Sequence, residues 1–214
     1  MVKEEDRAQR ILTLLKKEYP DVKGTELRFG NALELLIATI LAAQCTDKKV
    51  NQVTETLFKR YKTAEDCAKA DLEELQKIIK PTGFYRNKAK FIKAATEKLV
   101  KDFNSEMPRS IDEMTKLPGV ARKTANIVLS NAFGINEGVA VDTHVMRLSE
   151  RLGFTKEKDR EKIEKDLMRL FPKVQWFEVS NLLITHGRRT CAARHPKCGT
   201  CVLNKLCPSA FTFD

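Results

Sequence analysis

Apolar residues recur along most of the chain at the spacing of an α-helix. The first run follows the i, i+3, i+4, i+7 rule and comprises Ala8, Ile11, Leu12, Leu15 and Tyr19. Residues 32–44 are apolar nearly all round, which predicts a helix buried at the centre of the fold. Further helical runs are predicted at 50–61, 71–79, 88–103, 110–116, 122–132, 143–152, 160–171 and 176–186. Because no segment alternates convincingly between apolar and polar residues, the pattern predicts an all-α fold of about ten helices.

Size and charge limit the classes of protein to which the chain can belong. Its 214 residues are enough for one large domain or two small lobes. A hydrophobic content of 42% and a charged content of 32% are typical of globular proteins and exclude disordered and fibrous ones. Lys and Arg number 39 against 29 Asp and Glu, a net charge of +10. This excess favours nucleic acid as a partner, although lysines solvated on helix faces give the same total.

The sequence predicts no membrane segment. Its longest apolar stretch, 35–43, is too short to span a bilayer, and charged residues occupy positions 3–7, where a signal peptide would begin. The sequence has no heptad repeat and no spare apolar stripe that would predict an oligomer. We therefore expect an intracellular monomer, in the cytoplasm or nucleoid, with no membrane partner.

The segment 110–132 has the pattern of a helix–hairpin–helix. Leu117-Pro118-Gly119-Val120-Ala121 separates two helical runs, and Arg122 begins the second. Proline is expected to end the first helix, and glycine permits a turn that a Cβ would resist. The turn amides and the next helix's N-terminus then form a site for a phosphate oxygen, a contact that holds a duplex without reading its sequence. A plain connection between two helices is the alternative.

Two residues near this motif carry candidate chemistry. Lys123 lies in the first turn of the second helix, where the helix dipole and partial burial are expected to lower the pKa of its amine and favour a nucleophile. A lysine that contacts phosphate would occupy the same place. Asp142, in Val141-Asp142-Thr143-His144, begins the run at 143–152. Taken alone it is best read as a helix cap, although a capped carboxylate can also stabilise a developing cation.

Four of the six cysteines crowd into the last 24 residues, at Cys191, Cys198, Cys201 and Cys207. Their x6, x2 and x5 spacing has only one tight pair, whereas zinc modules usually have two. The spacing therefore favours a [4Fe–4S] cluster held by one loop, with zinc as the alternative. Cys45 and Cys67 lie in helical patterns and are expected to be small buried residues.

The order of these motifs resembles the endonuclease III family. The residues that carry the resemblance are Leu117 to Asn126, Val141 to His144 and the cysteine loop, and it extends over essentially the whole chain. The resemblance implies a bifunctional DNA glycosylase/AP lyase acting on oxidised pyrimidines or abasic sites in double-stranded DNA. It also implies two helical lobes flanking a DNA-binding groove: a six-helix bundle with the hairpin at 25–135, and a lobe of 1–24 and 136–214 with the [4Fe–4S] loop at 191–207.

The resemblance also assigns roles to single residues. Lys123 matches the lysine that forms a Schiff base and Asp142 the catalytic aspartate, while Cys191, Cys198, Cys201 and Cys207 match the cluster ligands. The hairpin residues Leu117, Gly119, Ala121 and Arg122 match DNA contacts. Gln44 matches the residue that fills the space left by the flipped base. Phe84 matches a wedge residue that is usually leucine, although core packing is an alternative for this side chain.

The chain departs from the family pattern at Phe84 and at Ala121, where the hairpin usually has glycine. Alanine is expected to fit if the backbone there is already helical, and phosphate binding is expected to survive. Two other functions remain open at this point. One is a non-catalytic iron–sulfur DNA-binding protein that senses redox state. The other is a monofunctional mismatch glycosylase on the same scaffold, a class that lacks a lysine at the position of Lys123.

Overall fold

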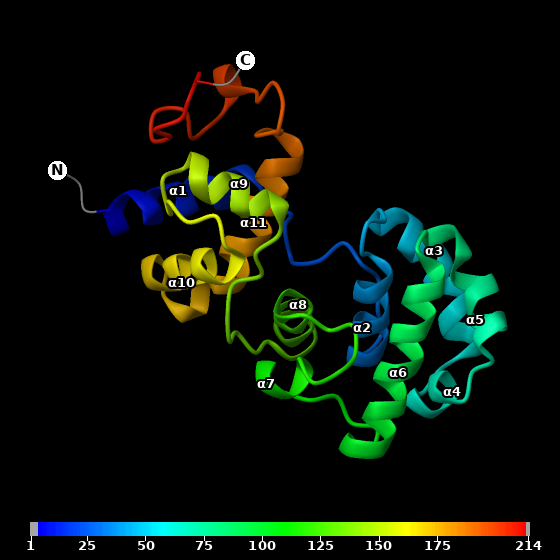
Figure 1. Ribbon diagram of the computed structural model, residues 1–214. Coiled ribbons are helices and arrows are strands. Elements are labelled where there is room, and N and C mark those ends of the chain that lie inside the picture. The colour runs from blue at the N-terminus through cyan, green and yellow to red at the C-terminus, as the bar shows by residue number, and fades with distance from the viewer. Residues whose placement is uncertain (1–3, 213–214) are drawn as a thin grey trace. The chain divides into compact units, whose positions relative to one another are not determined.

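A computed structural model describes residues 4–212 of the chain, and this part is all-helical. It contains eleven α-helices, three short 3₁₀ helices and no strand, which confirms the predicted fold class (Figure 1). The α-helices are α1 (Glu4–Glu18), α2 (Ala32–Leu41), α3 (Asp47–Arg60), α4 (Ala64–Ala68), α5 (Leu72–Ile79), α6 (Tyr85–Phe103), α7 (Ile111–Met114), α8 (Arg122–Phe133), α9 (Thr143–Arg151), α10 (Arg160–Leu170) and α11 (Trp176–Arg189). The 3₁₀ helices are η1 (Lys80–Thr82), η2 (Lys173–Gln175) and η3 (Cys198–Thr200).

The chain divides into two compact units, which are described separately. The central unit, Thr25–Glu137, is continuous in sequence. The discontinuous unit joins the residues up to Gly24 to those from Gly138 onward. Each has its own apolar core, so each satisfies the basic requirement of a folded domain.

Helix α2 forms the middle of the central unit's core. Six of its ten residues are buried, and it packs against α3, α6 and α8. The predicted run to residue 44 is too long, because α2 ends at Leu41 and the chain turns through Gln44 at a left-handed φ of 54°. Thr46 then caps α3 by accepting a hydrogen bond from the Lys49 amide, so the reversal leaves Gln44 at the surface.

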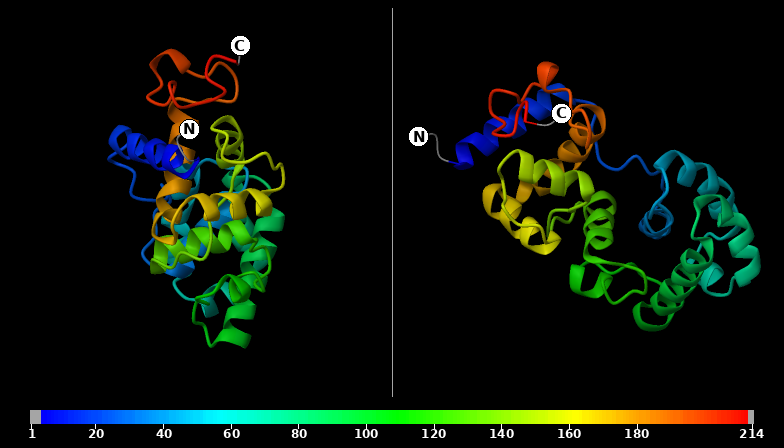
Figure 2. Two further views of the ribbon diagram at one scale, coloured as in Figure 1. Left: turned by 90° about the vertical axis from the view of Figure 1, so that its left-hand side faces the viewer. Right: turned by 45° about the horizontal axis from the view of Figure 1, so that its top comes forward.

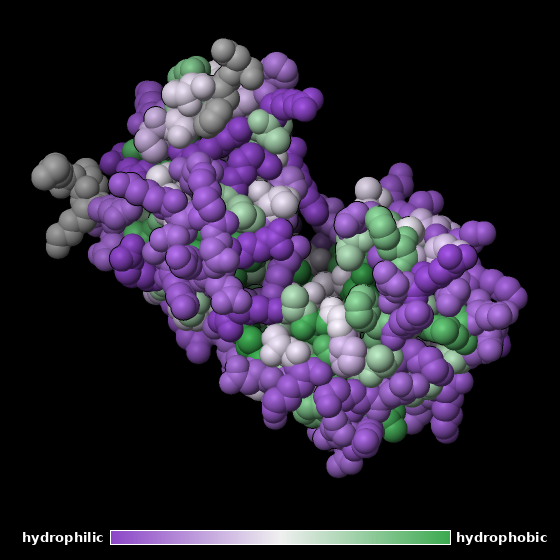
Figure 3. Space-filling view, in the orientation of Figure 1, coloured by the Kyte–Doolittle hydropathy of each residue, from purple (hydrophilic) through white to green (hydrophobic). Residues whose placement is uncertain are grey.

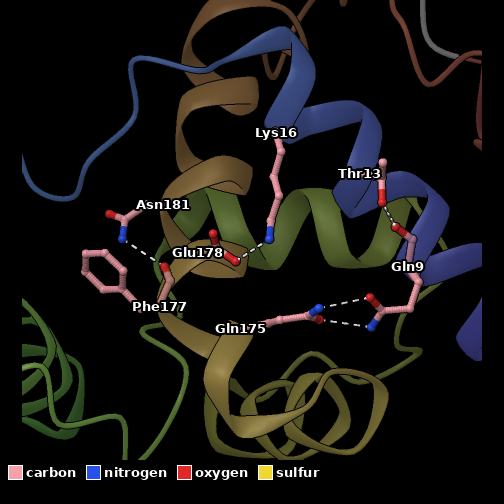
Figure 4. Close-up of polar contacts among 7 residues, drawn as sticks. All are labelled: Gln9, Thr13, Lys16, Gln175, Phe177, Glu178 and Asn181. Atoms are coloured by element: carbon pink, nitrogen blue, oxygen red, sulfur yellow. Dashed lines mark hydrogen bonds and ion pairs between the residues drawn. The ribbon is translucent and has the colours of Figure 1, made fainter.

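The discontinuous unit brings the first helix against the last one, as both views of Figure 2 show. The side-chain amides of Gln9 and Gln175 bond to each other twice, at 3.0 and 3.1 Å. Lys16 on α1 points to Glu178 on α11, with 2.6 Å between Nζ and Oε2 (Figure 4). Both ends of this ion pair are partly exposed, so it contributes at most about 1 kcal/mol. The buried apolar face of α1 therefore supplies most of the docking energy.

Hydrophilic side chains cover most of the molecular face drawn in Figure 3. Among the larger apolar side chains that remain exposed in the described residues are Phe84 and Phe91, both in the central unit. No helix in residues 4–212 is long and apolar enough to cross a membrane.

Candidate nucleic-acid interface and catalytic residues

The hairpin is a tight turn anchored in the central unit's core. Leu117, 1% exposed, packs in that core, and its carbonyl accepts a 3.1 Å hydrogen bond from the Val120 amide. Helix α7 already ends at Met114, so Pro118 does not terminate it, in contrast to the sequence prediction. The proline instead lies within the turn that leads to α8.

Gly119 is required at the tip of this turn for two reasons. Its φ of +77° lies in the left-handed region, where a side chain is strained. A Cβ at this position would also lie 2.7 Å from Cβ and Cγ of Phe91 on α6. The close approach of the hairpin backbone to this ring fixes where the turn presents its amides.

The N-terminus of α8 lacks a side-chain cap. Ala121 is the N-cap residue, and its methyl group cannot accept a hydrogen bond. Its backbone is extended, with φ −83° and ψ 165°, so alanine fits because any residue adopts this conformation and not because the backbone is helical. The first N–H groups of a helix have no intrahelical acceptor, which suits this end to an anion.

Lys123 is the second residue of α8, and its side chain is exposed. The partial burial assumed from the sequence is therefore wrong. Arg122, immediately before it, is half-buried and engaged in an interaction within the described structure. This exposure leaves the Lys123 side chain open to a partner outside the chain.

Asp142, in the discontinuous unit, caps α9. Its Oδ1 accepts hydrogen bonds from the amides of His144 and Val145, at 2.8 and 2.9 Å. Two N–H donors on one carboxylate oxygen hold the side chain at the helix N-terminus. The side chain is half-buried, so this anion has a fixed position.

Gln44 and Phe84 are exposed residues in two different turns of the central unit. Both have a left-handed backbone, with φ of 54° and 47° respectively. Phe84 is 64% exposed, which excludes core packing for its ring. A bulky apolar residue that is both exposed and strained is unusual and suits a contact with a partner.

The four tail cysteines line one cavity in the discontinuous unit, together with Arg151 and His186. Cys191 Sγ accepts a 3.3 Å hydrogen bond from Arg151, and Cys201 Sγ accepts a 3.4 Å bond from the Leu203 amide. Burial raises the pKa of the Cys201 and Cys207 thiols, and each neighbouring tail cysteine that carries charge adds to the rise. Thiolates gathered here therefore need a cation.

This donor set fits an iron–sulfur cluster. Four soft sulfur ligands around one cavity, with N–H donors aimed at two of them, are the arrangement that such a cluster needs. In residues 4–212 no three His, Cys, Asp or Glu side chains converge closely enough to hold a single metal ion. A cubane is larger than one ion and requires its ligands to stand further apart.

Sequence reasoning missed two residues of this cavity. Arg151 is 8% exposed and also donates to the carbonyls of Ala192 and Ala193, at 2.7 and 2.9 Å, so it fixes the loop that begins at Cys191. His186 is 2% exposed, with Nε2 3.5 Å from Cys201 Sγ. The spacing of Arg147 and Arg151, one helical turn apart, was a signal that could have indicated a shared role.

An all-helical fold with an uncapped helix after a tight Leu-Pro-Gly turn defines a helix–hairpin–helix protein. In agreement, residues 37–173 match the HhH-GPD superfamily of base excision DNA repair proteins. Endonuclease III of Synechocystis sp. is 52% identical over 98% of this chain and 95% of its own length. Endonuclease III of Bacillus subtilis is 50% identical over 85% of this chain and 83% of its own.

A solved structure of a trapped endonuclease III–DNA covalent intermediate is also similar. It superposes with a TM-score of 0.92 and 44% identity, covering 98% of each chain. The chain belongs to the endonuclease III family of DNA glycosylases/AP lyases, as the sequence resemblance predicted.

Proposed function

We propose that this chain removes oxidised pyrimidines from double-stranded DNA and nicks the abasic site through a Schiff base on Lys123. The observation that carries the proposal is the exposed amine of Lys123 on the first turn of α8, directly after the phosphate-binding turn. Asp142, held by two backbone amides, supplies a fixed negative charge for the sugar. Such a protein acts where duplex DNA is found, in the cytoplasm or nucleoid.

The chemistry follows from these two groups. The neutral amine of Lys123 attacks C1′ of a flipped nucleotide, and the N-glycosidic bond breaks with its electron pair passing to the base. Asp142 stabilises the positive charge that grows on the sugar as the base departs. The C1′–O4′ bond then breaks and the sugar ring opens: its electron pair passes to O4′, which takes up the proton released by the attacking nitrogen, while the nitrogen lone pair forms the C1′=N⁺ bond of an iminium. The iminium acidifies the C2′ proton. Removal of that proton expels the 3′-phosphate by β-elimination and cuts the strand 3′ to the lesion.

DNA binding is assigned to the central unit. The turn at Leu117–Ala121, with Gly119 at its tip and Arg122 beyond it, binds backbone phosphate through N–H groups and charge. Gln44 fills the space left by the flipped base, and Phe84 wedges between neighbouring bases, where stacking contributes about 1–3 kcal/mol. We propose that this unit is the lobe expected at 25–135 and that the discontinuous unit is the lobe with the cluster loop.

Cys191, Cys198, Cys201 and Cys207 are proposed to hold a [4Fe–4S] cluster. The cluster cross-links the loop at 191–207 and so contributes folding energy. Cys207→Ser should yield protein without the visible absorbance of iron–sulfur proteins, whereas Cys45→Ser should retain it. Iron and zinc analysis of the same samples separates a cluster from zinc. Zinc-loaded, colourless wild-type protein would overturn this assignment.

Borohydride trapping on a labelled duplex with one thymine glycol tests the catalytic proposal. Wild-type protein should form a covalent adduct with damaged DNA alone, and Lys123→Gln should form none while still binding the duplex. Lys116→Gln removes another exposed lysine of the same unit and should trap as wild type does. Base release without nicking or adduct would indicate a monofunctional glycosylase, and binding without base release a non-catalytic DNA-binding protein.

A further inference from the structure

Lys88 is a buried lysine of the central unit that the proposed chemistry does not use. It lies on the first turn of α6 and is 3% exposed. Its Nζ donates hydrogen bonds to the carbonyls of Leu41 and Thr82, at 2.7 and 2.8 Å. Burial lowers the pKa of the Lys88 amine, because the charged form loses its hydration. Lysine is seldom buried without a specific partner, so these two carbonyls define its role.

Each of the two carbonyls ends a helix. Leu41 is the last residue of α2, and Thr82 is the last residue of η1. The final carbonyls of a helix lack intrahelical donors, and the negative end of the helix dipole attracts a cation. One ammonium group therefore caps two helices that meet at the same point in the unit.

Both helix ends lead directly into the residues proposed to enter DNA. Gln44 follows Leu41 by three positions, and Phe84 follows Thr82 by two. The Lys88 amide also donates to the Phe84 carbonyl, at 3.1 Å, so Lys88 holds the second turn at two places. Gly83, between Thr82 and Phe84, has φ 69° and ψ 160°, a conformation that hardly any residue besides glycine adopts, and this allows the turn to form.

Left-handed backbone at Gln44 and Phe84 needs support from its surroundings. A non-glycine residue in this conformation costs about 1–2 kcal/mol, and it persists only where neighbouring contacts impose it. The contacts of Lys88 lie three positions before Gln44 and two positions before Phe84. They are the feature that the two turns share.

We propose that Lys88 is a positioning residue that locks the Gln44 turn and the Phe84 turn together, so that both side chains are presented to a duplex as one preorganised unit. The proposal rests on the proposed function in one respect, the roles of Gln44 and Phe84 in DNA. The clamp itself concerns the protein without DNA. Lys88 contributes no contact to the DNA and acts through the two turns alone.

The same helix provides a matched control. Lys93, one and a half turns further along α6, donates to the carbonyls of Ala68 and Ala70, each at 2.8 Å. It also bridges two backbone carbonyls, but at the end of α4, next to neither proposed DNA-entering residue. Lys88→Met and Lys93→Met therefore each remove a bridge between two backbone carbonyls, at different places. Lys93→Met also removes a 3.8 Å ion pair with the exposed Glu97, which contributes at most about 1 kcal/mol.

Hydrogen exchange of the DNA-free protein tests the clamp. Lys88→Met should accelerate amide exchange at 42–45 and at 82–85 together, while Lys93→Met should accelerate exchange near 68–70 only. Unchanged exchange in either turn of a folded Lys88→Met protein would overturn the proposal. If this variant does not fold, Lys88→Gln, which keeps two N–H donors at shorter reach, receives the same measurement and is judged by the same outcomes.

A duplex with 2-aminopurine beside an abasic-site analogue tests whether the clamp helps Gln44 and Phe84 to bind DNA. Binding of wild-type protein should raise the 2-aminopurine fluorescence by unstacking the base. Lys88→Met should lose about tenfold in affinity relative to Lys93→Met, within the range of couplings inside one hydrogen-bonded network. In a Gln44→Ala/Phe84→Ala background the same substitution should have almost no further effect. A full tenfold loss in that background would show that Lys88 acts by another route.

The two proposals fail in different ways. If wild-type protein forms no borohydride adduct, the catalytic assignment to Lys123 is wrong, yet the exchange and fluorescence results still decide the role of Lys88. If the adduct forms normally but the two turns respond independently to Lys88→Met, the clamp is wrong and the catalytic proposal stands.

Discussion

The hydroxyl of Tyr19 lies 2.8 Å from Nδ1 of His186, and this contact joins the first helical segment to α11 beneath the cysteine cavity. Burial lowers the pKa of His186 to about 4, so its ring is neutral and carries one N–H. A thiolate at Cys201 only accepts hydrogen bonds. The tautomer that fits the proposed cluster therefore carries its proton on Nε2, 3.5 Å from Cys201 Sγ, and accepts a hydrogen bond from Tyr19 at Nδ1.

Tyr19→Phe should destabilise the protein by leaving Nδ1 of His186 buried without this donor. We expect the free energy of unfolding to fall by about 1–3 kcal/mol, measured by urea titration of the cluster-loaded protein. Tyr61→Phe is the control, because its hydroxyl makes a longer bond, 3.4 Å, to the partly exposed Glu74. Equal losses in the two variants would argue against a special role for the Tyr19 contact.

Substitution of Asp142 should separate capping from catalysis. Asn caps helices about as well as Asp, so Asp142→Asn should retain stability and lose base excision, while Asp142→Ala should lose about 1 kcal/mol of stability as well. Melting curves and single-turnover base release measure the two effects. Asp159 caps α10 through the same pair of contacts, to the amides of Glu161 and Lys162, at 3.0 and 3.1 Å. The Asn and Ala variants of Asp159 should change the stability as the corresponding Asp142 variants do, but should keep full activity. Full activity of Asp142→Asn would show that base excision needs no charge at position 142.

Relief of backbone strain at Phe84 should stabilise the protein and weaken DNA binding. Asparagine tolerates a left-handed φ, so Phe84→Asn should raise the free energy of unfolding by about 0.5–1 kcal/mol. The same variant should lose affinity for an abasic duplex because it cannot stack. Phe29→Asn removes another exposed ring from a position without left-handed backbone and should not gain stability. A Phe84→Asn protein that binds abasic DNA as tightly as wild type would exclude the wedge.

Thiol labelling should distinguish Cys67 from Cys45. Burial raises the pKa of Cys67 from an ordinary 9.0 to about 12, so its reactive thiolate is scarce in the folded protein at pH 8. Cys45 lies half-buried in the Gln44 turn and should react first, as read by peptide mass mapping. Between pH 9 and about 12 only the unfolded chain loses the Cys67 proton, so this group makes stability fall as pH rises. Cys67→Ala should remove that part of the slope; rapid labelling of Cys67 at pH 8 would mean that α4 opens readily.

The sequence predicts helices well here because each apolar face follows a single period, but it predicts their ends less well. At the end of α2 the Leu41 carbonyl accepts from Lys88, 47 positions away, a contact that no local pattern shows. A reciprocal capping box forms at Thr63 and Asp66, while at Asp71 and Glu74, which have the same spacing, the structure shows Asp71 accepting from the Glu74 amide. Both spacings suit a box, and packing decides between them.

For the candidate site, too, the sequence predicted one part, the motif residues, and not the other, the residues that support them. Motif order identified the family and the residues proposed for chemistry, since reacting groups keep their type and spacing. The supporting residues Arg151, His186 and Lys88 contact backbone carbonyls or sulfur of other segments, and apart from the one-turn spacing of Arg147 and Arg151 the sequence carries no sign of these contacts. The exposure of Lys123 also depends on the surroundings of α8 and not on its own sequence.

The division into a continuous and a discontinuous unit sets an order of events during synthesis on the ribosome. Helix α1 emerges first, yet its packing partners α10 and α11 are translated more than 100 residues later. The central unit can complete its contacts in the meantime, because all of them lie within Thr25–Glu137. The apolar face of α1 therefore stays exposed until α10 and α11 have been made. Packing α1 against them closes a long loop of chain, which costs conformational entropy, so we expect the docking of α1 to be a late step of folding.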